Sequence, residues 1–254
     1  MSETDELISI IVPVYNAGTY IEETIAMVRA QSYSRWELIL VDDCSSDDSI
    51  SRIEDFMAGD NRNIRLIRKS SNEGAARARN TGIMEAKGRY IAFLDADDVW
   101  MPDKLEKELA FMKEKNAAFV FTAYEFGDEN AQRTGKIVHV PETLTYRQAL
   151  SRTIIFTTTV MLDTEQTGRE LIKMPEVESE DTATWWKILR KGFTAYGLNE
   201  VLAVYRRPAK SLSSNKLKAV KRIWNLYRKE EKLSLWCSGY HFLFWAAGAT
   251  LRRL

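Results

Sequence analysis

Four short apolar segments, separated by helical patterns, constrain the fold of this chain more than any other feature. The segments are Leu7–Val14, Glu37–Val41, Ile64–Ile67 and Tyr90–Leu94. They are rich in β-branched residues, as is typical of strands that are buried in a parallel sheet. The helical patterns between them lie near residues 19–31, 48–58 and 74–86. This alternation indicates a doubly wound α/β half-domain with a mostly parallel sheet and helices on both faces.

The pattern changes after Trp100 and again near Pro208. We expect a charged helix at 103–115, a strand at Ala117–Tyr124, and loops in the polar stretch 127–147. Further along, the sequence predicts a strand at Thr153–Leu162, a helix at Glu180–Lys191 and an extended segment at Phe193–Tyr205. The residues from 208 onward have a different composition and are treated as a separate tail.

Composition limits the class of protein. The chain has 254 residues, of which 45% are hydrophobic, enough to bury a large core. Lysine plus arginine equals aspartate plus glutamate, at 36 each, so we expect no nucleic-acid partner. Cys44, Cys237, His139 and His241 show no metal-ligand spacing, and the acidic first residues lack a secretory pattern. A cytoplasmic location is expected.

Polar residues follow each of the four strands, where ligands bind to open α/β sheets. The sharpest group is Asp95-Ala96-Asp97, because two carboxylates one residue apart can hold a ribose hydroxyl and a divalent cation. Mg²⁺ or Mn²⁺ there would bridge the oxygens of a diphosphate. The alternative is that Asp97 and Asp98 cap a helix, although their position directly after an apolar strand favours the metal site.

Two other groups suit a nucleotide. A carboxylate at Asp42 or Asp43 can accept the imide proton of uracil or thymine while Tyr15 stacks on the base, although the residues that follow also form a turn. The segment that begins at Asn72 opens a helix, whose free amide groups favour a pyrophosphate. Arg79 lies about 200° round that helix from Arg77, so it can point inward while Arg77 is solvated.

Five segments in fixed order resemble glycosyltransferase family two, which has the GT-A fold. They are IIVPVYN, LILVDDCSSDDS, NEGAARARNTG, GRYIAFLDADD and SEDTATWW, and together they extend over roughly residues 7–205. The resemblance implies a catalytic domain at 1–207, with a nucleotide-binding half at about 7–100 and an acceptor-binding half at about 101–207.

The resemblance also implies roles for individual residues. Those expected to bind the nucleotide are Pro13, Tyr15, Asp42, Asn72, Arg79, Asp95, Ala96 and Asp97. Among them Asp95 lies near the ribose and Asp97 on the Mn²⁺ or Mg²⁺ ion. Asp181 is expected to be the catalytic base, with Glu180 and Trp185 on the acceptor side. Two alternatives stay open, namely that Ser179–Asp181 is a helix cap and that Trp185 or Trp186 packs in the core.

The tail at 208–254 is basic and then apolar. Lys216–Lys232 has the pattern of an amphipathic helix facing an anionic membrane, and Leu233–Leu251 carries no formal charge. The tryptophans and polar residues of the second segment favour lying in the membrane interface over spanning the bilayer. Packing of the tail on the catalytic domain or on another subunit is the remaining alternative. We expect a peripheral or monotopic protein on the cytoplasmic side of the membrane.

The whole pattern predicts an inverting, metal-dependent transferase that uses a nucleoside-diphosphate sugar, with uridine as the favoured base. Similarity to bacterial enzymes of capsule, teichuronic-acid and related surface-polysaccharide assembly implies a lipid-linked saccharide acceptor. A dinucleotide oxidoreductase is excluded because no G-x-G-x-x-G follows the first strand. The alternative is a non-catalytic nucleotide-sugar-binding or scaffolding subunit. The donor sugar, the acceptor, the linkage and the oligomeric state stay open.

Overall fold

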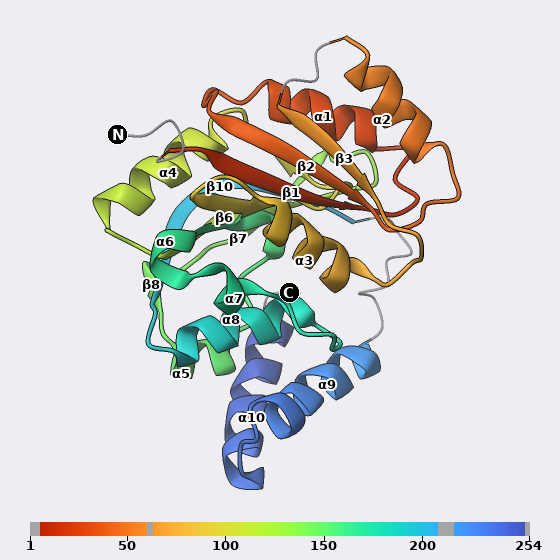
Figure 1. Cartoon of the computed structure of the whole chain (residues 1–254). Helices are drawn as coiled ribbons and strands as arrows, with labels where there is room; N and C mark the ends of the chain where they lie inside the picture. Colours follow the sequence, from red (N-terminus) through yellow and green to blue (C-terminus); the bar gives the residue numbers. More distant parts are fainter. Residues whose placement is uncertain (1–5, 60–62, 208–215, 252–254) are drawn as a thin grey trace.

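The computed structural model describes residues 6–59, 63–207 and 216–251, which form a mixed sheet with helices on both faces and a helical hairpin (Figure 1). The first half contains β1 (Ile8–Val14), α1 (Ile21–Arg29), β2 (Trp36–Asp42), α2 (Ser49–Met57), β3 (Ile64–Arg68), α3 (Ala75–Glu85), β4 (Tyr90–Phe93), β5 (Val99–Trp100) and α4 (Lys104–Glu114). These bounds confirm the strands and helices that the sequence predicts up to residue 115.

The second half contains β6 (Phe119–Gly127), β7 (Arg133–Val138), β8 (Thr143–Leu144), α5 (Tyr146–Leu150), the 3₁₀ helix η1 (Thr157–Thr159), β9 (Val160–Asp163), α6 (Thr164–Thr167), α7 (Arg169–Ile172), α8 (Glu180–Arg190) and β10 (Ala195–Arg206). The stretch 127–147 is therefore not only loop, because β7 pairs with β6 and β8 pairs with β10. The predicted strand at Thr153–Leu162 is mostly wrong, since regular pairing begins only at Val160.

The strand order is β3-β2-β1-β4-β9-β6-β10-β5. The strands β1 to β4 pair in parallel, as expected for a doubly wound half-domain. In the second half β9 enters between β4 and β6 and is antiparallel to both, whereas β10 pairs with β6 in parallel. The strands β2 and β4 lie on opposite sides of β1, so the direction in which successive strands are added reverses at β1. In folds of this type, ligands bind in the crevice at the carboxyl ends of the strands where that reversal occurs.

Alternating side chains along the strands form two cores. On one face Ile10 and Val12 of β1 pack with α1, α2 and α4. On the other face Ile11 of β1 packs with α3 and α8. A β-carbon at Gly82 of α3 would approach Ile11 Cγ2 to 2.4 Å, so this glycine permits close packing of α3 on the sheet. The site therefore rests on strands that have an apolar core on each face.

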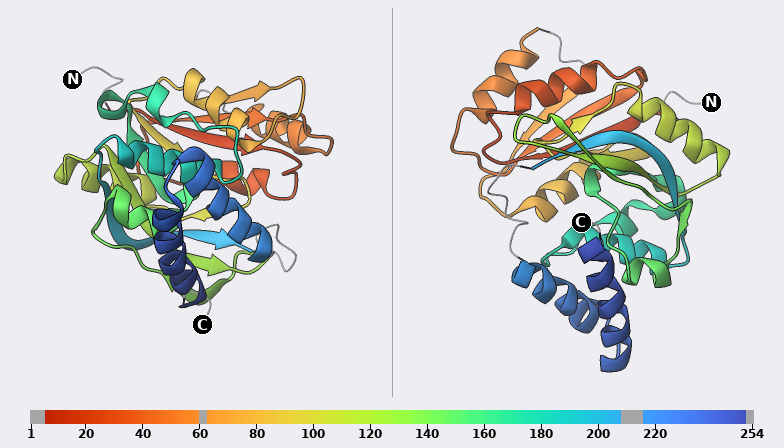
Figure 2. Two further views of the ribbon diagram at one scale, coloured as in Figure 1. Left: turned by 90° about the horizontal axis from the view of Figure 1, so that it is seen from below. Right: turned by 180° about the vertical axis from the view of Figure 1, so that it is seen from behind.

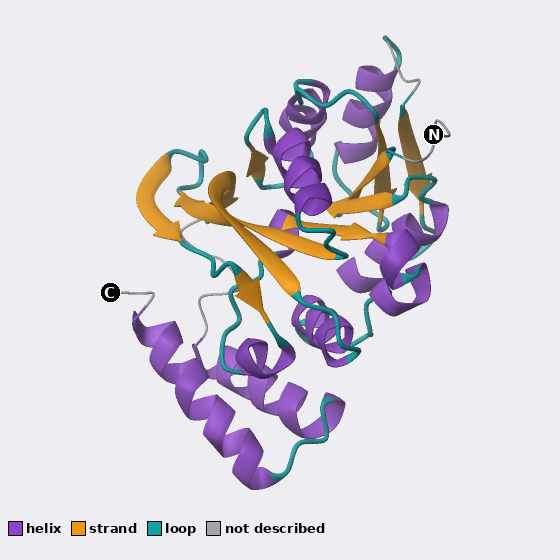
Figure 3. Cartoon of the chain, turned by 90° about the vertical axis from the view of Figure 1, so that its left-hand side faces the viewer, coloured by secondary structure: helices purple, strands orange, loops and turns teal. Residues whose placement is uncertain are grey.

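The tail forms the helices α9 (Lys216–Asn225) and α10 (Leu235–Leu251), joined by a π-helical turn, η3 (Leu226–Glu230). Figures 2 and 3 show them as a hairpin beneath the sheet, on the side of α5 and α8. The ring of Tyr227 stacks on Trp186 of α8 with centroids 5.3 Å apart, and both are buried. The predicted domain boundary adjoins residues 208–215, which lie outside the described residues. Within the described ranges, no helix has the length and hydropathy to cross a bilayer.

Candidate active site

Two cavities meet at the carboxyl ends of β1 and β4. The first, which we call the strand-end cavity, has a volume of about 540 Å³ and lies between the loop after β1, the start of α3 and the loop after β4. The second, the tail-side cavity, has a volume of about 450 Å³ and extends from the start of α8 to α9 and α10. Arg79 and Asp95 line both cavities, so this pair marks their junction.

The strand-end cavity collects most of the residues that the sequence predicts for nucleotide binding. Its lining includes Pro13, Tyr15, Asn72, Arg79, Asp95, Ala96 and Asp97. The ring of Tyr15 is 54% exposed, so one face is free to stack on a planar ligand. The wall at the start of α3 is made of small residues, and Gly74 there has a φ of 90°, which favours glycine. A flat, polar ligand with a phosphate tail fits this arrangement.

Asp42 and Asp43 take different positions. Asp42 ends β2, is buried, and accepts a hydrogen bond from the backbone N–H of Ser45 at 3.3 Å. Asp43 lines the strand-end cavity and binds the Lys69 ammonium and the backbone N–H of Gly74, at 2.7 and 2.6 Å. Burial opposes its charge, but these bonds lower the pKa of Asp43 below its usual value. The structure thus gives Asp43 a place in the cavity wall, and the role of Asp42 in base binding stays a prediction.

The loop after β4 is fixed by a threonine from η1. The hydroxyl of Thr158 donates to Asp98 at 2.6 Å and accepts from the backbone N–H of Asp95 at 3.1 Å. Asp98 is buried, and burial followed by the charges of Asp95 and Asp97 raises its pKa. Asp98 is therefore a structural acid, whereas Asp97 lines the cavity.

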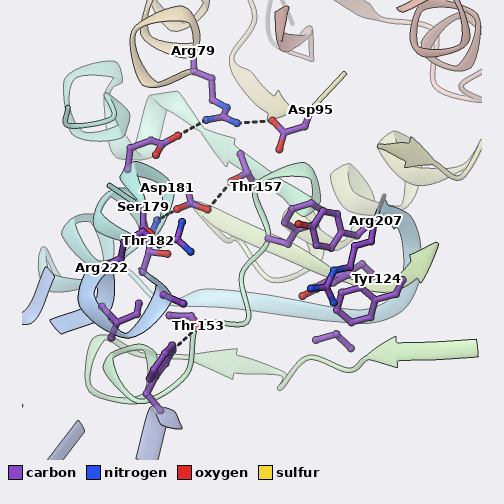
Figure 4. A pocket seen from close by; sticks show the side chains of 18 of the residues that line it. Arg79, Asp95, Tyr124, Thr153, Thr157, Ser179, Asp181, Thr182, Arg207 and Arg222 are labelled. Carbon is purple, nitrogen blue, oxygen red and sulfur yellow. Dashed lines mark hydrogen bonds and ion pairs between the residues drawn. The ribbon is translucent and has the colours of Figure 1, made fainter. Parts of the chain in front are cut away.

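Arg79 connects the two halves of the site. Its guanidinium lies 2.6 Å from Asp95 Oδ1 and 2.9 Å from Glu180 Oε1, and its side chain is buried (Figure 4). Although burial works against the charged form, the Asp95 and Glu180 carboxylates raise the pKa of Arg79. The inward orientation predicted for Arg79 is confirmed. Arg77 instead forms exposed ion pairs with Glu73 and Glu176, at 2.8 Å each.

Asp181 lies at the start of α8 in the tail-side cavity. Its Oδ2 accepts a hydrogen bond from Thr157 Oγ1 at 3.2 Å, and its Oδ1 accepts one from the backbone N–H of Thr182 at 2.6 Å. The preceding residue, Ser179, has a left-handed backbone with a φ of 62°, a conformation that often marks functional sites. The neighbouring Glu180 is committed to Arg79. Asp181 is thus the carboxylate that is better placed to accept a proton from a ligand in this cavity.

Trp185 does not line the acceptor side. Its side chain is 2% exposed and packs between Phe93 of β4 and Phe119 of β6, with ring centroids 5.9 and 5.4 Å away. Trp185 lies on the same face of α8 as Asp181 but one turn further along the helix, where that face packs on the sheet. The expectation of an acceptor role for Trp185 is therefore wrong, and the core alternative holds for both tryptophans.

The acidic residues of the strand-end cavity can hold a metal ion only if a bound ligand supplies further coordinating atoms. Burial and the nearby charge of Asp95 raise the pKa of Asp97, so a cation beside it would relieve an unfavourable concentration of negative charge. Within the described residues, however, no group of three or more His, Cys, Asp or Glu side chains is arranged to hold a metal. Mg²⁺ sites with one or two carboxylates obtain their remaining ligands from substrate phosphates and water. Asp97 fits a site of this kind, in which one protein carboxylate and the substrate phosphates share the ion.

Two site residues were missed from the sequence. Thr157 and Thr158 lie on η1, in a stretch that the sequence predicts as a strand, and their roles depend on contacts with residues 24 and 60 positions away. Hydroxyl residues in a run such as Thr157-Thr158-Thr159 suit either a strand or a hydrogen-bonding turn. No local signal distinguishes the two.

Comparisons with known proteins agree with this geometry. The family model Glycosyl transferase family 2 matches residues 9–166. The chain is 46% identical over 255 residues to "Putative teichuronic acid biosynthesis glycosyltransferase TuaG" of Bacillus subtilis, with 100% of both chains covered. It is 39% identical to "UDP-Glc:alpha-D-GlcNAc-diphosphoundecaprenol beta-1,3-glucosyltransferase WfgD" of Escherichia coli, over 87% of this chain and 85% of the relative.

Solved structures show the same fold. Staphylococcus aureus TarS 1–349 in complex with UDP-GlcNAc superposes with a TM-score of 0.70 at 20% identity, covering 94% of this chain and 71% of TarS. The mannosyltransferase PcManGT from Pyrobaculum calidifontis, in complex with GDP-Man and Mn²⁺, gives a TM-score of 0.71 at 19% identity, covering 96% and 75%. The chain has the GT-A fold, belongs to glycosyl transferase family 2 and is a glycosyltransferase.

Proposed function

We propose that this chain is an inverting transferase that moves a sugar from a uridine-diphosphate sugar to a lipid-linked saccharide in bacterial surface-polysaccharide synthesis. The observation that carries the proposal is the junction at Arg79 and Asp95, with Asp97 on one cavity and Asp181 on the other. The strand-end cavity takes the donor, and the tail-side cavity takes the acceptor. The anomeric carbon of the donor then lies between the two cavities.

The arrangement of the two cavities supports an inverting mechanism. An acceptor hydroxyl in the tail-side cavity attacks the anomeric carbon from the side opposite the diphosphate, while Asp181 accepts the hydroxyl proton. The new C–O bond forms as the bond to the diphosphate oxygen breaks. Hydrogen bonds from the Thr157 hydroxyl and the Thr182 backbone N–H hold the Asp181 carboxylate at the wall of this cavity. Glu180 is less suited to this role because it is paired with Arg79.

Uridine and a divalent cation complete the donor site. Tyr15 stacks on the base, Asp95 binds the ribose, and Asp97 with the donor phosphates holds Mg²⁺ or Mn²⁺. The cation, when bound, offsets the charge that develops on the leaving diphosphate. The TarS structure contains UDP-GlcNAc, which supports a uridine-diphosphate sugar as donor. The PcManGT structure contains GDP-Man and Mn²⁺, which supports a nucleotide-sugar donor and a divalent cation.

The tail seats the protein on the cytoplasmic side of the membrane as a peripheral or monotopic protein. One side of α10 packs on the domain, whereas Trp236, Leu243 and Leu235 are 90%, 70% and 64% exposed. The tail also carries exposed lysines at 221, 229 and 232, in α9, in η3 and before α10. A tail with both exposed apolar side chains and cations suits the interface of an anionic lipid leaflet. The name of E. coli WfgD, which specifies a diphosphoundecaprenol acceptor, supports a lipid-linked substrate.

A transfer assay tests the proposal. Purified protein is incubated with Mn²⁺, a panel of UDP-sugars and GlcNAc-α-diphosphate that carries a short phenoxyalkyl chain or, in parallel, lipid extracts from polysaccharide-producing bacteria. We expect one UDP-sugar to give a product with a β-linkage from an α-linked donor, and chelation to stop the reaction. Donor binding without transfer to any acceptor would favour the non-catalytic subunit, and a retained α-linkage would contradict inversion.

A further inference from the structure

Arg206, the last residue of β10, lies beside the acidic loop at residues 95–98, and strand register places it there. β5 directly follows the loop, and Val99 of β5 pairs with Val204 of β10 in antiparallel register. Each step back from Val99 is matched by a step forward from Val204, so this register brings Asp97 opposite Arg206. The pairing of two strands thus brings a cation to the residue that we propose as the metal ligand.

The guanidinium of Arg206 is buried and uses all three of its nitrogen atoms. The residue is 6% exposed, and its Nε donates to the carbonyl oxygen of Asp97 at 2.6 Å. Nη2 binds Glu23 Oε2 of α1 at 2.6 Å, and Nη1 donates to the carbonyl oxygen of Glu129 at 3.3 Å. The backbone N–H of Arg206 donates to Asp98 Oδ1 at 3.2 Å. Arg206 therefore connects the loop to α1 and to the turn between β6 and β7.

Two side chains hold successive carbonyl groups of the loop. Thr24 of α1 donates to the carbonyl of Ala96 at 2.7 Å, and Arg206 donates to the carbonyl of Asp97. A charged donor forms a hydrogen bond about twice as strong as a neutral one, so the stronger restraint acts at Asp97. The guanidinium also lies over the ring of Tyr20, 4.8 Å from its centroid, and Tyr20 lines the strand-end cavity. Arg206 does not appear in the described lining of either cavity, so it acts through these neighbours.

We propose that Arg206 is a positioning residue of the donor site, which holds the backbone of Asp97 so that its carboxylate meets the cation in a fixed direction. The inference rests on the proposed function and adds to it a residue outside both cavities. Mg²⁺ accepts ligands only in near-octahedral geometry, so the direction of its single protein carboxylate matters. Groups that orient a metal ligand from behind are typically worth about 10- to 100-fold in metal affinity.

UDP binding, measured by calorimetry with saturating Mn²⁺ and again with EDTA, separates positioning from a merely structural role. The ratio of the two affinities is the metal-dependent gain. We expect Arg206→Lys, which keeps the charge but loses the planar fork, to lower this gain about tenfold or more and to leave UDP affinity in EDTA near wild type. Arg52→Lys is the matched control, because Arg52 is exposed and also binds α1, through Glu22 at 2.9 Å. It should keep the full gain.

A double substitution sharpens this test. In an Asp97→Asn background no carboxylate is left to be positioned, so adding Arg206→Lys should change UDP affinity in Mn²⁺ by less than about twofold. Should Arg206→Lys not fold, Glu23→Ala removes one partner of the guanidinium from an exposed side chain of α1. We expect Glu23→Ala to lower the metal-dependent gain in the same direction, by about threefold.

Three results would overturn the inference. The first is a wild-type gain in both Arg206→Lys and Glu23→Ala. The second is an equal loss of UDP affinity with Mn²⁺ and with EDTA, which would make Arg206 purely structural. The third is an undiminished effect of Arg206→Lys in the Asp97→Asn background. If wild-type UDP binding does not depend on Mn²⁺, the metal site of the proposed function fails and the inference fails with it. If Asp97→Asn loses the gain while Arg206→Lys keeps it, the inference fails alone.

Discussion

Arg79 connects the walls of the two cavities, because its buried guanidinium binds Asp95 after β4 and Glu180 at the start of α8. Removal of Glu180 would leave part of that guanidinium without its partner. We expect Glu180→Ala to reduce the free energy of unfolding by about 1.5–3 kcal/mol, the usual worth of a hydrogen bond to a charged group. Denaturant unfolding measures this loss, with the exposed Glu178→Ala as the control. Unchanged stability together with complete loss of transfer would instead make Glu180 the catalytic base.

Asp97 has a different role from its buried neighbour Asp98. Asp97→Asn should lower transfer by several orders of magnitude and abolish the metal dependence of nucleotide binding, because it removes the carboxylate that we propose as the protein's ligand to the cation. The melting temperature should stay near that of wild type, since none of the hydrogen bonds described above depends on the Asp97 carboxylate. Calorimetry with UDP, with and without Mn²⁺, measures the effect beside the remote exposed control Asp55→Asn. Metal-dependent UDP binding that persists in Asp97→Asn would contradict this assignment.

Residue types at strand ends were sufficient to predict much of the site. Tyr15, Asn72, Arg79, Asp95 and Asp97 all lie on the strand-end cavity because the ends of parallel strands share one edge of the sheet. The orientation of neighbouring residues was less predictable. Where a strand or helix ends, a shift of one residue decides which side chain faces a cavity. Asp43 therefore lines the cavity although its neighbour Asp42 was predicted to. For the same reason, η1 is a 3₁₀ helix in a stretch predicted as a strand.

At the level of elements, α10 is held to α5 partly through a histidine. His241 is buried, its Nδ1 lies 2.8 Å from Ser151 Oγ, and burial lowers its pKa below the ordinary value of about 6.5. The neutral ring is therefore the form that the folded state favours. Its contribution to stability is complete above the unfolded-state pKa, and it is lost as the pH falls through the lower folded-state pKa.

Thermal unfolding between about pH 7 and pH 5.5 tests the role of His241. The melting temperature of wild-type protein should fall more over this range than that of His241→Asn, whose amide can keep a hydrogen bond to Ser151 without titrating. His139→Asn, on an exposed loop, is the control and should follow wild type. Equal pH dependence in wild type and His241→Asn would show that the buried ring does not contribute.

The strands differ in how well the local pattern of apolar and polar residues predicts them. Strands β1 to β4 were predictable because each is an apolar run between helical patterns, whereas β7 is nearly all exposed and has no apolar alternation. Pairing with β6 selects its extended form. The antiparallel insertion of β9 likewise depends on which gap in the sheet the returning chain fills, and no local propensity encodes that choice.

At the scale of the whole molecule, the tail has one face buried on the domain and one exposed face, which we propose contacts the membrane. We expect Trp236→Ser combined with Leu243→Ser to reduce sedimentation with vesicles of phosphatidylglycerol and phosphatidylcholine by about tenfold or more, because both exposed apolar groups are lost. Met84→Ser, which removes a 62% exposed side chain on α3, is the control. Vesicle binding that survives the double substitution would place the membrane contact elsewhere.

Point substitutions are better suited to this question than deletion of residues 208–254. Ile223, Leu226, Tyr227 and Trp245 of the tail are buried in the same core cluster as α8. Deletion would uncover Trp186 and open one wall of the tail-side cavity, so it would alter folding and acceptor binding together. The basic and aromatic pattern predicted the helices of the tail, but its packing on the domain depends on side chains that the linear sequence does not bring together.

The most direct test of the account is Asp181→Asn, measured for both binding and transfer. Asparagine keeps the size and hydrogen-bonding shape of the side chain but cannot accept the acceptor proton. We expect the transfer rate to fall about 10²- to 10⁴-fold or more, with the dissociation constants for UDP and Mn²⁺ close to wild type. Near-normal transfer by Asp181→Asn, or a loss of donor affinity equal to the loss of rate, would contradict the assignment of Asp181 as the base between two cavities.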